Sequence, residues 1–111
     1  MPINSKNKGK RGELMLCRFL RDNGYDAHRT AQYCGNTGEA ADVVGLPGVH
    51  IECKYVERIN LRDALEQARS DAFGTGNIPV VFHRCNDKPW VVCMDAEDFM
   101  TIYAEWEAGR K

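Results

Sequence analysis

The stretch from Ala41 to Val56 reads ADVVGLPGVHIECKYV and decides the fold. Two runs rich in β-branched residues flank a Pro-Gly pair, a pattern typical of two antiparallel strands joined by a short turn. Pro-Gly favours type II geometry, which splays a two-residue hairpin loop, so we expect a longer loop, Leu46 to Gly48. In that register Asp42 lies directly opposite Glu52.

Alternation along the second strand sorts its side chains onto two faces, because residues two apart point the same way. His50, Glu52 and Lys54 share one face. The other face is apolar and is expected to be core; it consists of Val49, Ile51, Cys53 and Tyr55. Facing residues of an antiparallel pair have Cβ atoms about 4.5–5.5 Å apart, so the hairpin presents Asp42, Glu52 and Lys54 as one cluster.

Two opposed carboxylates repel each other unless a cation lies between them. Mg²⁺ takes oxygen ligands and typically uses only one or two protein carboxylates. The pair of Asp42 and Glu52 therefore indicates a metal site. A solvated pair with Lys54 as counter-ion is the alternative that hairpin geometry alone leaves open. His50 lies on the same face near the turn, and we expect it to be a bystander rather than a base.

The residues before the hairpin predict one helix and one weak strand. Apolar residues at helical spacing indicate a helix from Gly12 to Asn23, with Glu13 in its first turn. Weak alternation from Tyr25 to Thr30 predicts a strand, and the polar segment from Gln32 to Glu39 predicts a loop.

The residues after the hairpin predict two helices and two strands. Asn60 is a suitable cap for a helix with one apolar face. That face consists of Leu61, Ala64, Leu65, Ala68 and Ala72. Strands are expected at Ile78–His83 and Trp90–Met94, and a last helix from a cap at Asp95 through Trp106. The order α-β-β-β-α-β-β-α predicts an α/β fold of the mixed α+β kind, with a central mixed sheet of about five strands flanked by helices.

Length and composition indicate a single globular domain. A chain of 111 residues has the length of one domain, and we expect a basic N-terminal arm over residues 1–10 and the domain over residues 11–111. No apolar run approaches the ~20 residues that span a membrane. The basic start has no apolar run behind it and is not a secretory signal, so we expect a cytoplasmic protein.

Cysteine spacing excludes two kinds of small scaffold. The chain has 5 cysteines and no CxxC pair, which argues against both a disulfide framework and a structural zinc site. Cys17, Cys53 and Cys93 lie within apolar patterns, and we expect them to be reduced core residues.

The charges are unevenly distributed along the chain. The net charge of −1 does not indicate a DNA-binding protein, but Lys8, Lys10 and Arg11 crowd one short segment near the start. In a metal nuclease, the carboxylates of the active site can offset the basic residues that face the DNA, so that the net charge does not reveal those residues. A solvated tail on a neutral globule is the alternative interpretation.

These residues together resemble a known nuclease group. The pattern Asp-x₉-Glu-x-Lys, with a Glu on the preceding helix, resembles the PD-(D/E)XK nuclease superfamily, and more narrowly the archaeal-type Holliday junction resolvases and their phage relatives. The similarity covers roughly residues 6–85. The matching features are Lys8-Gly9-Lys10-Arg11-Gly12-Glu13, Gly24-Tyr25, Arg29, and Asp42 with Glu52-Cys53-Lys54.

The resemblance implies a restriction-endonuclease-like core that hydrolyses phosphodiester bonds in DNA. It implies that Glu13, Asp42, Glu52 and the Cys53 backbone carbonyl bind Mg²⁺, with Mn²⁺ as a substitute. The metal would polarise the phosphate and lower the pKa of a bound water. Lys54 would orient that water or stabilise charge on the phosphate oxygens.

Supporting roles are expected for several polar residues. Relatives place a glutamine near the lysine, and Gln67 on the second predicted helix matches it; simple solvation is its alternative. The candidates for phosphate contacts, each of which is otherwise a surface charge, are Lys8, Lys10, Arg11 and Arg29.

A junction-cutting enzyme is expected to be a two-fold homodimer, because a four-way junction needs paired incisions. We expect the C-terminal aromatic residues to pack in the core, with a dimer contact as the alternative; they are Trp90, Phe99, Tyr103 and Trp106. Two other functions stay open: a nuclease of the same superfamily acting on flaps, ends or duplex, and an inactive nuclease-fold module that only binds DNA.

Overall fold

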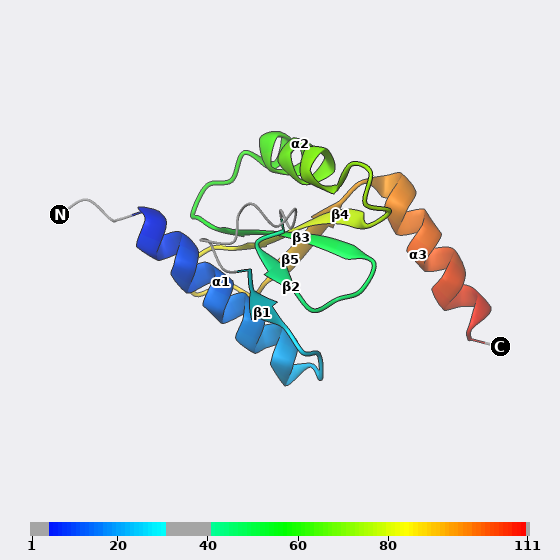
Figure 1. Cartoon of the computed structure of the whole chain (residues 1–111), viewed down its shortest axis with the longest axis horizontal. Coiled ribbons are helices and arrows are strands. Elements are labelled where there is room, and N and C mark those ends of the chain that lie inside the picture. Colours follow the sequence, from blue (N-terminus) through cyan, green and yellow to red (C-terminus); the bar gives the residue numbers. More distant parts are fainter. Residues whose placement is uncertain (1–4, 31–40, 111) are drawn as a thin grey trace.

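The computed structural model describes residues 5–30 and 41–110. A five-stranded sheet lies between two helices, while a third helix extends to one side (Figure 1). The elements are α1 Ser5–Asp22, β1 His28–Arg29, β2 Val43–Val44, β3 Val49–Tyr55, α2 Leu61–Ala72, β4 Ile78–Arg84, β5 Val91–Met94 and α3 Ala96–Ala108. This order confirms the predicted α-β-β-β-α-β-β-α fold. None of the helices in the described ranges is long and apolar enough to cross a membrane.

The predicted register of the β2–β3 hairpin is confirmed. Val43 pairs with Ile51, the same offset that brings Asp42 beside Glu52. The turn closes where expected, because the Val49 N–H donates to the Leu46 carbonyl at 3.0 Å. A one-residue slip would have turned the Asp42 side chain away from Glu52.

The sheet is mixed because one of its connections is a helix. Its strands lie in the order β1-β2-β3-β4-β5, and only β3 and β4 run parallel in this described sheet. Parallel neighbours need a long crossover, which α2 provides. The Asn60 side chain caps α2 as predicted, since its Oδ1 accepts from the Asp63 N–H at 3.1 Å.

The two faces of the sheet have different cores. On the α1 face, Ile51, Val80 and Phe82 pack with apolar residues of α1; those are Leu16, Cys17 and Leu20. On the α2 face, Val81 packs under Ala64 and Ala68. Because alanines are small, α2 lies close to β3 and β4 on the face that carries Glu52.

The predicted start of the first helix was too late. The sequence placed it at Gly12, after an arm over residues 1–10, but α1 begins at Ser5, so Lys8 and Lys10 are helical. The first strand is shorter than predicted and contains His28 and Arg29 alone. The predicted loop from residue 32 to 39 lies outside the described residues.

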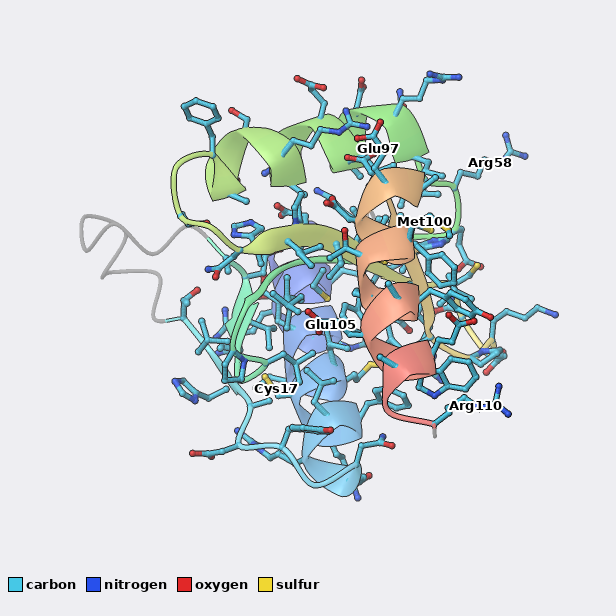
Figure 2. All side chains as sticks on the ribbon, turned by 90° about the vertical axis from the view of Figure 1, so that its right-hand side faces the viewer. Cys17, Arg58, Glu97, Met100, Glu105 and Arg110 are labelled. Carbon is cyan, nitrogen blue, oxygen red and sulfur yellow. The ribbon has the colours of Figure 1, made fainter. Side chains whose placement is uncertain are left out.

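Helix α3 contradicts the expectation that the C-terminal aromatics pack in the core. Trp90 does pack against the α1 side, but Phe99, Tyr103 and Trp106 are exposed, and no residue of α3 is buried. Figure 2 shows α3 in front of the rest of the fold, with Met100 and Glu105 along it. Apolar residues alone did not ensure burial, because the preceding strand β5 is the sheet edge and directs α3 away from both layers.

A close contact between α1 and β3 generates the first prediction. A Cβ added at Gly12 would overlap the Cβ of Tyr55, whereas one added at Gly9 on the same helix would meet no atom within 4 Å. We expect Gly12→Ala to lower the free energy of unfolding by about 1–3 kcal/mol, because overpacking shifts α1. Gly9→Ala should raise it by about 0.5–1 kcal/mol through helix propensity. Urea unfolding of both variants measures this, and equal stabilities would contradict the close-approach argument.

Candidate active site

Glu52 is the most deeply buried acid of the cluster, with 2% of its surface exposed. Its Oε2 has no hydrogen-bond partner among the described residues. Burial, together with the neighbouring Asp42 carboxyl, raises the pKa of Glu52 to about 9. The metal-free protein therefore keeps this carboxyl protonated at neutral pH, and a cation that replaced the proton would remove the cost of the buried charge.

Asp42 is held in place by the backbone of β3. Its Oδ2 accepts from the Cys53 N–H at 2.9 Å, and its own N–H donates to the Ile51 carbonyl at 3.0 Å. These bonds fix the half-buried carboxyl just before the start of β2, beside Glu52.

Glu13 approaches the cluster from α1 and is paired with Arg29. The Arg29 Nε donates to Glu13 Oε1 at 2.8 Å, and the two side chains are 19% and 14% exposed. Burial raises the pKa of Glu13, and the negative charge of Asp42 adds to this, while Arg29 opposes both. Arg29, predicted to contact phosphate, thus neutralises a site carboxylate in the metal-free protein.

Lys54 and Gln67 meet across the gap between β3 and α2. The Lys54 Nζ donates to Gln67 Oε1 at 3.5 Å, a long bond between exposed groups. The positive charge of Lys54 acts on Glu52, because it lowers the pKa that burial raises. Gln67, predicted from resemblance to lie near the lysine, therefore does so.

His50 and Asp71 form a cluster with Glu52 that the sequence did not predict. One ligand atom from each of the three lies within 4.8 Å of the others. Among the described residues, these three are the His, Cys, Asp or Glu side chains whose ligand atoms lie close enough together to hold one metal ion. The group includes neither Glu13 nor Asp42. The i, i+4 spacing of Gln67 and Asp71 on α2 was the available signal, since it puts both on one helix face.

The predicted phosphate-binding residues of α1 lie in the turns before Glu13. The Lys8 Nζ lies 5.1 Å from the centre of the Tyr55 ring, which places it at the end of β3. Lys10 and Arg11 are exposed. Their charged groups therefore face solvent.

Comparisons with known proteins identify the family and a similar fold. A family model described as "Phage putative PDDEXK endonuclease" matches residues 4–109. The fold is similar to the structure of Hjc from Archaeoglobus fulgidus, a Holliday junction resolvase from an archaeal hyperthermophile, with a TM-score of 0.59 and 27% identity. That match covers 78% of this chain and 72% of the archaeal one. No curated protein matches the sequence.

The raised pKa of Glu52 generates a prediction for the metal-free protein. Its usual pKa is 4.5 and its folded value about 9, so between these values the folded chain holds a proton that the unfolded chain has released. The contribution of the protonated Glu52 carboxyl to the free energy of unfolding is complete below pH 4.5 and is lost as the pH rises through 9. Glu52→Gln should remove this loss and make the protein more stable than wild type at pH 8, by on the order of 5 kcal/mol.

Denaturant unfolding in a chelator at several pH values from 5 to 9 checks this expectation. Glu97→Gln on α3 is the matched control (Figure 2), because Glu97 is exposed, and it should keep the wild-type pH slope. An identical pH slope for Glu52→Gln and wild type would show that Glu52 is ordinarily charged in the fold.

Proposed function

We propose that this chain, which belongs to the "Phage putative PDDEXK endonuclease" family, is a metal-dependent endodeoxyribonuclease that hydrolyses DNA phosphodiester bonds. One observation carries the proposal. The fold buries the Glu52 carboxyl next to the Asp42 carboxyl, with an oxygen unpartnered among the described residues and Lys54 close by. Such an arrangement destabilises the fold, and destabilising groups of this kind are found where a cation or a reaction requires them.

The donor set fits a hard divalent cation. Glu13, Asp42, Glu52 and the Cys53 backbone carbonyl offer oxygen atoms, which Mg²⁺ prefers, and Mn²⁺ can replace it. When bound, the ion would supply Lewis-acid chemistry to the scissile phosphate and a lower pKa for the attacking water. In the absence of the ion, Arg29 balances the charge of Glu13. When the ion is bound, Arg29 would be free to contact phosphate.

Lys54 would act on the phosphate itself. Its ammonium group is a compact charge with three donors, suited to oxygens that gain negative charge in the transition state. Gln67 would limit the rotamers of Lys54 through the bond to its Nζ. Lys8, Lys10 and Arg11 would bind phosphates of the DNA backbone beside the scissile bond. Such contacts are favourable because they release the counter-ions condensed on the DNA.

We propose a four-way junction as the preferred substrate. The support is the similarity, at 27% identity, to a protein described as a Holliday junction resolvase. Flaps, ends or linear duplex are the competing substrates within the same chemistry. A nuclease-fold module that binds DNA without cutting it is the competing function, and the intact acidic and lysine side chains disfavour it.

We propose that the protein acts as a homodimer through α3 and β5. Their exposed large apolar residues are Val91, Val92, Phe99, Met100, Ile102, Tyr103 and Trp106. Such a surface rarely stays in water on a monomeric protein. A two-fold dimer would present two sites to a substrate with two-fold symmetry.

Cleavage assays test the activity. With Mg²⁺, wild type should cut a synthetic four-way junction faster than a flap or a linear duplex. Asp42→Asn and Lys54→Ala should each slow cleavage at least about 100-fold, because the first removes the charge of a metal ligand and the second removes the positive charge beside the reacting phosphate. Asp87→Asn is the control, since Asp87 lies in an exposed turn at φ 62, which asparagine tolerates.

The outcomes separate the candidate functions. Equal rates on all three substrates would reject junction preference and leave the nuclease proposal standing. Junction binding without cleavage in Mg²⁺ or Mn²⁺ would favour the binding-only module. Unchanged activity in Lys54→Ala would reject the proposed role of the lysine.

The dimer proposal has its own test. Trp106→Glu puts a charge at the C-terminal end of the row of exposed aromatic rings on α3, where Trp106 contacts Tyr103 with ring centres 5.6 Å apart. We expect a dimeric mass for wild type and a monomeric mass for this variant in light scattering at about 10 µM. Phe73→Ser, which changes an 89% exposed phenylalanine outside α3 and β5, should remain dimeric. A monomeric wild type would contradict the proposal.

A further inference from the structure

The His50 side chain is buried without a use in the proposed nuclease chemistry. Only 3% of its surface is exposed, and its Nε2 has no hydrogen-bond partner in the described part of the chain. An unpaired buried polar nitrogen destabilises the fold, so a ligand that pairs with it would be favoured. Glu52, two residues further along β3, carries the second unpartnered buried atom, Oε2.

Asp71 reaches the same place from α2. Along β3, Lys54 and Glu52 lie about 6.6 Å apart, and along α2, Gln67 and Asp71 lie about 6 Å apart. Because these spacings match, Glu52 lies near Asp71 just as Lys54 lies near Gln67. The negative charge of Asp71 acts on Glu52 and opposes the effect of the Lys54 charge.

The dimensions of the cluster fit one metal ion. The three ligand atoms lie within 4.8 Å of one another. Three ligands spaced evenly around one ion at about 2.1 Å lie about 3.6 Å apart, so side-chain shifts of less than about 1 Å would close the site. Asp71 is half-buried, so the cluster borders solvent, and His50 also lines a surface cavity of about 350 Å³ with Gly48 and Asn77.

We propose that His50, Glu52 and Asp71 form a second divalent-cation site, on the α2 side of Glu52, that prefers Mn²⁺ to Mg²⁺. The preference follows from the imidazole nitrogen, which suits transition metals, whereas Mg²⁺ selects oxygen. The site shares Glu52 with the proposed magnesium site and does not require that the protein cut DNA. An ion here would join α2 to β3 and so hold Gln67 beside Lys54.

Manganese titration of the full chain tests the proposal. Wild type should bind two Mn²⁺ per chain in calorimetry at pH 7.5, and pulsed electron paramagnetic resonance should show coupling to an imidazole nitrogen. His50→Gln should abolish the nitrogen signal and reduce the stoichiometry to one. Asp71→Asn, a half-buried position that tolerates the change, should weaken the same site at least about 10-fold.

Two controls separate this site from the proposed nuclease site. Asp42→Asn should lose the other ion and keep the nitrogen signal, and Asp63→Asn, exposed two turns earlier on α2, should leave both sites unchanged. A single Mn²⁺ without nitrogen coupling in wild type, or two ions in both His50→Gln and Asp71→Asn, would overturn the second site. Cleavage in Mg²⁺ would be unaffected by that failure, so it tests the nuclease proposal independently.

Discussion

The structure depends on the close approach of two carboxyl groups inside a protein. The hairpin register brings Asp42 beside Glu52, and the strand that carries Glu52 is covered by α2. Burial alone would raise the pKa of Glu52, and a second acid beside it raises the pKa further. The arrangement is costly in the absence of a cation, and this cost supports the metal site proposed above.

The two helices bring different partners to this pair. Helix α1 can approach β3 because Gly12 has no Cβ, and the next residue, Glu13, then reaches the cluster with Arg29 as its counter-ion. Helix α2 lies close because its inward face is alanine, which leaves space for polar side chains between helix and sheet. The same small residues that pack the fold therefore determine which side chains meet at the site.

Helix α3 shows where local pattern stops being informative. Its apolar residues recur as in a core helix, yet they lie in solvent because β5 is the edge of the sheet and the α1 and α2 layers are complete without α3. Its start is nevertheless fixed. Asp95 is the N-cap residue of α3, as predicted, but its side chain accepts two bonds of 2.8 and 2.7 Å from Arg69 of α2 and none from the backbone of α3. An anchored helix with a free apolar face is suited to contact another protein surface.

The sequence by itself determined the order of elements, the hairpin register and the side-by-side placement of Asp42, Glu52 and Lys54. These depend on spacing of two or three residues and on turn chemistry, which act locally. Tertiary structure alone decided the pairing of Glu13 with Arg29, the burial of His50, its meeting with Asp71, and the exposure of α3. Those contacts join residues distant in the chain, and the solvent exposure of each side chain is set by which layers pack over it, a property that no single segment contains.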